Sequence, residues 1–149
     1  MKALIVALCL FAAPASATTY TIGPATDPGG VVFDYFAKYD GWYHEQADVR
    51  IEGECDSACT MVLGFIPNDR ICATANAEFG FHSASRGGKY AKVMTALLWE
   101  LYPERVLRLL APLGLGKPIE HPAFVFVEAQ KIVHPCGPRQ EAAAAKPQE

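Results

Sequence analysis

With 149 residues, the chain is long enough for one domain with a buried core, and its formal net charge of −3 leaves no excess of basic side chains. This acidic balance argues against nucleic acid as a partner, because binding to phosphates calls for a basic face. No spacing of histidines, cysteines or acids indicates a metal site, and no motif indicates another cofactor.

The N-terminus has the pattern of a secretory signal peptide. Lys2 precedes an apolar stretch that begins at Ala3 and ends at Ala13, and Ala15-Ser16-Ala17 forms a small-x-small cleavage site. The apolar stretch is short for a membrane-spanning helix, although an uncleaved anchor is the alternative. We therefore predict that residues 1–17 are removed after Ala17, that the protein is periplasmic or secreted, and that the mature chain has no membrane segment.

The rest of the chain predicts one domain over residues 18–136, in which strands alternate with helices. Predicted strands are β-prone or alternating segments, at 19–22, 48–52 (with one solvated face), 70–74, 78–82 and, unless it is a buried helical turn, 124–127. Apolar spacing predicts helices over 32–43, 57–65, 93–101 and from Pro103 onward. Residues 23–30, 53–56 and 83–89 are predicted connections, and 137–149 a disordered tail. This order favours an α/β layered fold, with a mainly parallel sheet and flanking helices.

Four cysteines remain in the mature chain: Cys55, Cys59, Cys72 and Cys136. In an exported protein, four cysteines favour two disulfides, which can be paired in three ways. We expect Cys59–Cys72 together with Cys55–Cys136. Three residues separate Cys55 from Cys59, which is neither the usual zinc-knuckle spacing nor the Cys-x-x-Cys redox spacing.

Three segments carry candidate chemistry. Asp27-Pro28-Gly29-Gly30 is a glycine turn that opens a helix, where backbone N–H groups can hold an oxyanion or simply form a turn. Ser57 begins a short apolar helix, so it is either an N-cap or a nucleophile with the N–H of Ala58 beside it. His82 ends an apolar strand, as a general base or as an ordinary packed or surface histidine.

In their order and spacing, the segments "DPGG", "SACTMVLGF" and "AEFGFHSA" resemble the Clp protease proteolytic subunit and its crotonase-like relatives. The pattern "C-x-S-A-C-T" followed by "G-F-H" is more similar still to small exported bacterial proteins that are regarded as periplasmic Clp-like proteins. The resemblance covers residues 27–84. It implies a trimmed, disulfide-stabilised Clp/crotonase-like fold, and either a peptide or protein substrate or a binding partner.

Residue by residue, the resemblance implies a serine hydrolase. Ser57 would be the nucleophile, His82 the general base, and the backbone N–H groups of Gly29 and Ala58 the oxyanion donors. The family's acidic residue follows its histidine well downstream, where Glu128 is the candidate in this chain. Lys89 or Lys92 would be an alternative base. The other implied function is a catalytically degenerate Clp-like module with a binding or structural role.

Overall fold

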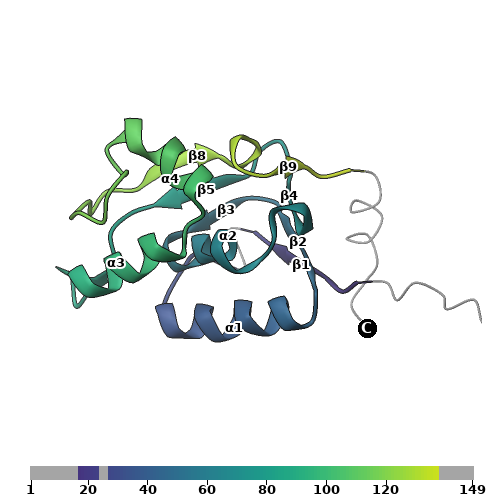
Figure 1. Cartoon of the computed structure of the whole chain (residues 1–149), viewed down its shortest axis with the longest axis horizontal. Helices are drawn as coiled ribbons and strands as arrows, with labels where there is room; N and C mark the ends of the chain where they lie inside the picture. Colours follow the sequence, from purple (N-terminus) through teal and green to yellow (C-terminus); the bar gives the residue numbers. More distant parts are fainter. Residues whose placement is uncertain (1–16, 24–26, 138–149) are drawn as a thin grey trace, which may run out of the picture.

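The computed structural model of the chain describes residues 17–23 and 27–137 (Figure 1). The predicted signal peptide, except Ala17, lies outside the described residues. So does the predicted tail, except Gly137. In the described ranges, no helix combines the length and the apolar character needed to cross a membrane.

Four short strands form a fully parallel sheet in the order β1-β2-β4-β9. They are β1 (Thr19–Ile22), β2 (Asp48–Ile51), β4 (Ile71–Ala73) and β9 (His134–Pro135). The register aligns Ile22 with Ile51 and Ile51 with Ala73, and all three side chains are buried. The prediction of a mainly parallel sheet with flanking helices is confirmed.

A second sheet has the order β3-β5-β8 and consists of β3 (Glu54–Asp56), β5 (Glu78–Phe81) and β8 (Val125–Glu128). β3 is parallel to β5, whereas β8 is antiparallel to it. Only Glu52 and Gly53 separate β2 from β3, so the chain passes almost directly from the first sheet into the second. The prediction that residues 53–56 form only a connection is therefore wrong, because three residues are too few to display a strand's period in the sequence.

The predicted helices are present, and they flank the strands. They are α1 (Val32–His44), the 3₁₀ turn η1 (Ser57–Met61) that continues into α2 (Val62–Phe65), α3 (Lys92–Leu101) and α4 (Glu104–Leu110). Further 3₁₀ turns are η2 (Asn68–Arg70), η3 (Ala111–Leu113) and η4 (Ala129–Lys131). In Figure 1, α1 lies on the opposite side of the molecule from α4 and β8. The predicted loop at 83–89 contains a hairpin, β6 (Ser85–Arg86) and β7 (Lys89–Tyr90).

The packing decides how far α1 and β2 are buried. Along the apolar stripe of α1, only Tyr39 is buried, while Phe36 and Tyr43 are each 48 % exposed. The face of 48–52 that was predicted to be solvated is so only in part, because Arg50 is buried and its Nε donates to Glu52 at 2.6 Å, while Asp48 is half-buried and Glu52 is exposed. A charged side chain is buried in a strand only when a partner offsets its lost hydration.

The cysteines form two disulfides, as predicted, but the expected pairing is wrong. Cys55 is bonded to Cys59, with their Cα atoms 5.3 Å apart, because η1 folds back directly after β3. Cys72 is bonded to Cys136, with a Cα separation of 4.8 Å, because β9 is the parallel neighbour of β4. The sequence alone does not contain these strand pairings. Two disulfides fit an extracellular or periplasmic protein.

Candidate active site

Ser57 and His82 lie beside each other at the carboxyl ends of β3 and β5. Because these strands are parallel and Asp56 is opposite Gly80, the residues that follow them leave the sheet at the same edge. Nε2 of His82 is 2.7 Å from Oγ of Ser57. The structure thus brings together two residues that were nominated from the sequence, at a distance over which a serine can pass its proton to an imidazole.

Ser57 has an unusual backbone conformation. Its φ is 57°, in the left-handed region that residues other than glycine rarely adopt. Asp56, not Ser57, is the N-cap of η1, and no side chain caps this turn. The N-cap interpretation of Ser57 is therefore wrong, because its hydroxyl contacts His82 instead. A nucleophile elbow also has its serine on a strained strand-to-helix turn, but in the motif Gly-x-Ser-x-Gly, where this chain has Cys55 and Cys59 in place of the glycines.

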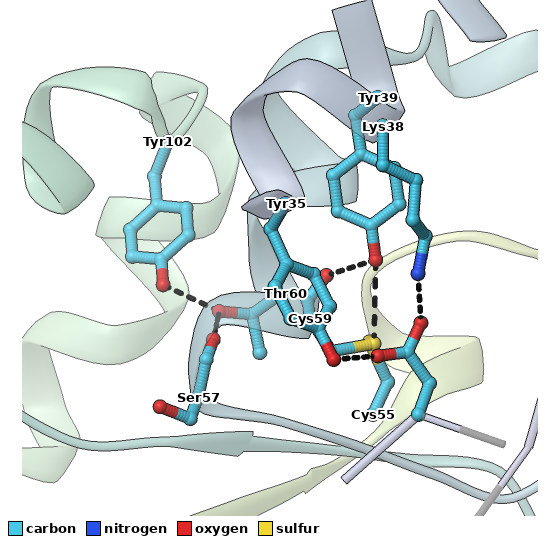
Figure 2. Close-up of a disulfide and its surroundings, with 9 residues drawn as sticks. Tyr35, Lys38, Tyr39, Cys55, Ser57, Cys59, Thr60 and Tyr102 are labelled. Carbon is cyan, nitrogen blue, oxygen red and sulfur yellow. Dashed lines mark hydrogen bonds and ion pairs between the residues drawn. A yellow bond between two sulfur atoms is a disulfide. The ribbon is translucent and has the colours of Figure 1, made fainter. Parts of the chain in front are cut away.

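The Cys55–Cys59 disulfide closes this turn around Ser57 (Figure 2). Both sulfurs belong to fully buried residues. The hydroxyl of Tyr39, from α1, donates to the carbonyl oxygen of Cys59 at 3.0 Å. The backbone on either side of Ser57 is thus covalently joined, and it is also tied to a helix that is remote in sequence.

A second support comes from Thr60 and Tyr102, which the sequence analysis missed. The Thr60 hydroxyl donates to the carbonyl oxygen of Ser57 at 2.6 Å, and so the Tyr102 hydroxyl, 2.6 Å from Thr60 Oγ1, donates to Thr60 (Figure 2). Tyr102 is buried, and burial raises its pKa to about 12, so this donor stays protonated at neutral pH. No sequence pattern links these two residues, because Tyr102 lies on a different element from the turn.

His82 is partly buried against the ring of Phe124, with the ring centroids 4.3 Å apart. Burial lowers the pKa of His82 below its usual 6.5, because the imidazolium loses hydration. At neutral pH the imidazole is therefore uncharged, the form that can accept a proton from Ser57. Within the described ranges, no acidic side chain is bonded to the ring of His82.

Glu128 does not meet His82, contrary to the expectation from its sequence position. β8 is antiparallel to β5, so Glu128 lies opposite Glu78 at the start of β5, whereas His82 follows the end of that strand. Four residues of strand span about 13 Å. Glu128 is bonded instead to Lys131, at 3.0 Å. The strand direction separates the predicted acid from the predicted base.

The glycine turn packs against the serine. Gly29 has a φ of 85°, and a Cβ at this position would lie 2.5 Å from the carbonyl oxygen of Asp56 and 2.8 Å from Cβ of Ser57. Only glycine fits this approach. Gly29, one of the two predicted oxyanion donors, is thus in direct contact with the serine turn. Ala58, the other predicted donor, is buried and directly follows Ser57.

The other candidate groups do not converge on this contact. Lys89 and Lys92 are exposed, and no contact with Ser57 is found for either. A hollow of about 330 Å³ beside β8 is lined by neither Ser57 nor His82. Over the described part of the chain, no three histidines, cysteines or acids are grouped as metal ligands would be.

In comparisons with known proteins, no family model matches the chain and no curated protein matches it.

Proposed function

We propose that the protein is an exported serine hydrolase with a trimmed Clp/crotonase-like fold, and that it acts on an acyl bond of a peptide or protein. The observation that carries this proposal is the 2.7 Å contact between Nε2 of His82 and Oγ of a serine held in a left-handed turn. A neutral imidazole and a hydroxyl within hydrogen-bond distance of it are the two groups that nucleophilic acyl transfer requires.

The proposed reaction has two stages. Ser57 Oγ attacks the carbonyl carbon while Nε2 of His82 takes its proton, and the resulting imidazolium then protonates the departing amine or alcohol. A water molecule next attacks the acyl-serine ester and gives a proton to His82. Collapse of that intermediate releases the carboxylic acid and returns the proton to Ser57, so the enzyme is unchanged.

The oxyanion formed in each stage would lie beside the Ser57 turn. Ala58 N–H follows the nucleophile directly, and the Gly29 backbone packs against Ser57. One well-placed donor of this kind lowers the barrier by about 3 kcal/mol.

The second candidate is a catalytically degenerate Clp-like module with a binding or structural role. It is favoured by one observation, that no acid is bonded to the His82 ring in the described part of the chain. In serine hydrolases, such an acid orients the imidazole and stabilises the imidazolium. Packing of His82 on Phe124 restricts the ring without supplying that charge. The hydrolase we propose is accordingly a serine–histidine dyad.

A fluorophosphonate probe on the purified mature protein distinguishes the two functions. We expect covalent labelling of wild type, loss of labelling in Ser57→Ala and at least severe slowing in His82→Ala. Ser85→Ala, in the exposed hairpin, is the matched serine control and should label like wild type. Glu128→Gln should also label like wild type. Labelling that persists in Ser57→Ala would remove Ser57 from the mechanism, and no labelling of wild type would favour the binding module.

A further inference from the structure

Asp27, the first residue of the glycine turn, is a buried carboxylate with both oxygens occupied. It is only 2 % exposed. The Tyr35 hydroxyl donates to its Oδ1, and Nζ of Lys38 lies 2.5 Å from its Oδ2. A carboxylate is removed from water only when charged or hydrogen-bonding partners replace the lost hydration. Both partners come from one face of α1, since they are three residues apart on the helix.

Lys38 is held in place from several sides. Its Nζ lies 4.6 Å, 5.0 Å and 5.1 Å from the ring centroids of Tyr35, Tyr39 and Trp42, respectively. These rings present their negative faces to the ammonium group, which adds to the attraction of Asp27. The long lysine side chain therefore has one preferred position, and the ion pair becomes a fixed link between α1 and the glycine turn.

The same helix face also contacts the serine turn. Tyr39, whose ring borders Lys38, donates to the carbonyl oxygen of Cys59. Figure 2 shows Lys38 and Tyr39 extending from one helix toward the disulfide-closed turn that carries Ser57. α1 thus holds the glycine turn through Asp27 and the serine turn through Tyr39. The packing of Gly29 on Ser57 lies between these two attachments.

We propose that Asp27 and Lys38 are positioning residues for the acyl transfer at Ser57. Their ion pair fixes the glycine turn against the serine turn, so that the backbone around Gly29 and Ala58 keeps the shape into which the oxyanion must fit. This inference rests on the proposed hydrolase function. Neither residue contacts Ser57 or His82, so their effect is on the geometry of stabilisation and not on the proton transfer.

The test separates positioning from stability by comparing single and double variants. Lys38→Met keeps the length of the side chain but leaves the Asp27 carboxylate unpaired, and should lower both the melting temperature and the rate of fluorophosphonate labelling. In Lys38→Met combined with Asp27→Asn, no buried charge is left unpaired, and the melting temperature should recover. The labelling rate should stay reduced, on the order of tenfold to hundredfold, since a small misplacement of donors has effects of that size.

The pH dependence of labelling provides the second readout. Because His82 is not changed, the pH at the midpoint of the labelling profile should be the same in the double variant as in wild type. Lys131→Met breaks the exposed ion pair with Glu128 and is the matched control, with labelling at the wild-type rate expected. If Lys38→Met does not fold, Asp27→Asn alone serves for the same comparison.

The outcomes distinguish a failure of the hydrolase proposal from a failure of the positioning roles of Asp27 and Lys38. Wild-type protein that does not label at Ser57 would overturn the hydrolase proposal, and the positioning roles with it. If wild type labels and the double variant labels equally fast, the hydrolase proposal stands and the positioning roles are refuted. If both the labelling rate and the melting temperature recover in the double variant, the Asp27–Lys38 ion pair contributes to stability and not to positioning.

Discussion

The imidazole of His82 and the hydroxyl of Ser57 are joined, at 2.7 Å, across the ends of two parallel strands. Each residue follows directly after the end of its strand. The backbone can turn there, and the side chain does not have to point to one face of the sheet. Parallel strands place their carboxyl ends at one edge, and in α/β proteins such edges commonly hold the functional groups. The contact is therefore a product of strand direction and register together.

The rate of fluorophosphonate labelling should fall as the pH is lowered, with a midpoint below 6.5. Burial lowers the pKa of His82, so the neutral imidazole persists to lower pH than in an exposed histidine. The rate should be constant above the midpoint until other groups titrate. The measurement is the labelling rate against pH in wild type and in His82→Asn, whose profile should lose this step. A wild-type midpoint above 6.5 would contradict the prediction.

The same shift has a consequence for stability. The folded state binds the proton of His82 less readily than the unfolded chain does, so acid favours unfolding. The contribution of neutral His82 is present at neutral pH and is lost as the pH falls through 6.5, where the unfolded chain takes up the proton. His82→Asn should therefore flatten the dependence of the melting temperature on pH in this range.

Gly29→Ala should be more damaging than alanine at another left-handed glycine. Gly29 and Gly114 have nearly equal φ values, 85° and 83°, but a Cβ on Gly114 meets no atom within 4 Å. Gly114→Ala should therefore lower the free energy of unfolding only by the conformational cost of a left-handed alanine, about 1–2 kcal/mol. Gly29→Ala should lose more, since the new methyl group collides with Asp56 and Ser57, and labelling at Ser57 should fall as well.

Chemical denaturation and probe labelling of both variants test this comparison. Gly29→Ala that is as stable and as reactive as Gly114→Ala would show that the glycine turn does not press on the serine turn in solution.

The two disulfides should differ in what they contribute: Cys72–Cys136 should matter more for stability, and Cys55–Cys59 more for the reactivity of Ser57. Cys72–Cys136 closes a loop with a sequence separation of 64, and Cys55–Cys59 one with a separation of 4. The loss of loop-closure entropy in the unfolded chain predicts a stabilisation of about 4 kcal/mol from the long loop and about 2 kcal/mol from the short one. The double alanine variant of Cys72 and Cys136 should therefore be the less stable.

Labelling should rank the two pairs the other way. The double alanine variant of Cys55 and Cys59 loses the covalent closure around Ser57, so its labelling rate should fall further than that of the other pair, measured at a temperature where both are folded. If labelling simply followed the melting temperature in the two variants, the short disulfide would have no particular role at the site.

Asp56→Asn should stabilise the fold at neutral pH. The pKa of Asp56 is raised, first by burial and then by the nearby carboxylates of Glu54 and Glu78, and its Oδ1 is buried without a hydrogen-bond partner. A carboxyl group with a raised folded pKa favours the fold while protonated, and this contribution is lost as the pH rises through that pKa. The charged form at neutral pH is therefore unfavourable, and asparagine of similar size removes the charge.

The stabilisation should shrink as the pH is lowered into the range where wild-type Asp56 is itself protonated. Melting temperatures of the two proteins from acidic to neutral pH measure this difference, with Asp69→Asn on the exposed turn η2 as the control. A variant that is less stable than wild type at neutral pH would indicate that the Asp56 charge has a favourable partner in solution.

Much of the local architecture and part of the candidate site could be predicted from the sequence. The apolar spacing correctly predicts α1 and α3 as helices, although part of each apolar stripe is exposed, as Phe36 and Val93 are. The roles predicted for Ser57 and His82 are those that the resemblance to the Clp/crotonase-like family implies, and this resemblance is carried by the order and spacing of short motifs. That prediction did not require knowing that the two side chains meet. Tyr35 and Lys38, three residues apart after Asp27, were a signal in principle, but polar residues spaced in this way are ordinary on a helix surface.

By itself, the sequence determined the main helices, most of the strands and the residue types available for chemistry, because backbone preferences and apolar periodicity are local properties. The tertiary structure decided which distant residues touch. It set the left-handed conformation of Ser57, the Cys55–Cys59 and Cys72–Cys136 pairings, and the separation of Glu128 from His82. Each of these depends on strand direction, register or packing between segments far apart in the chain, and such relations leave no period in a single sequence.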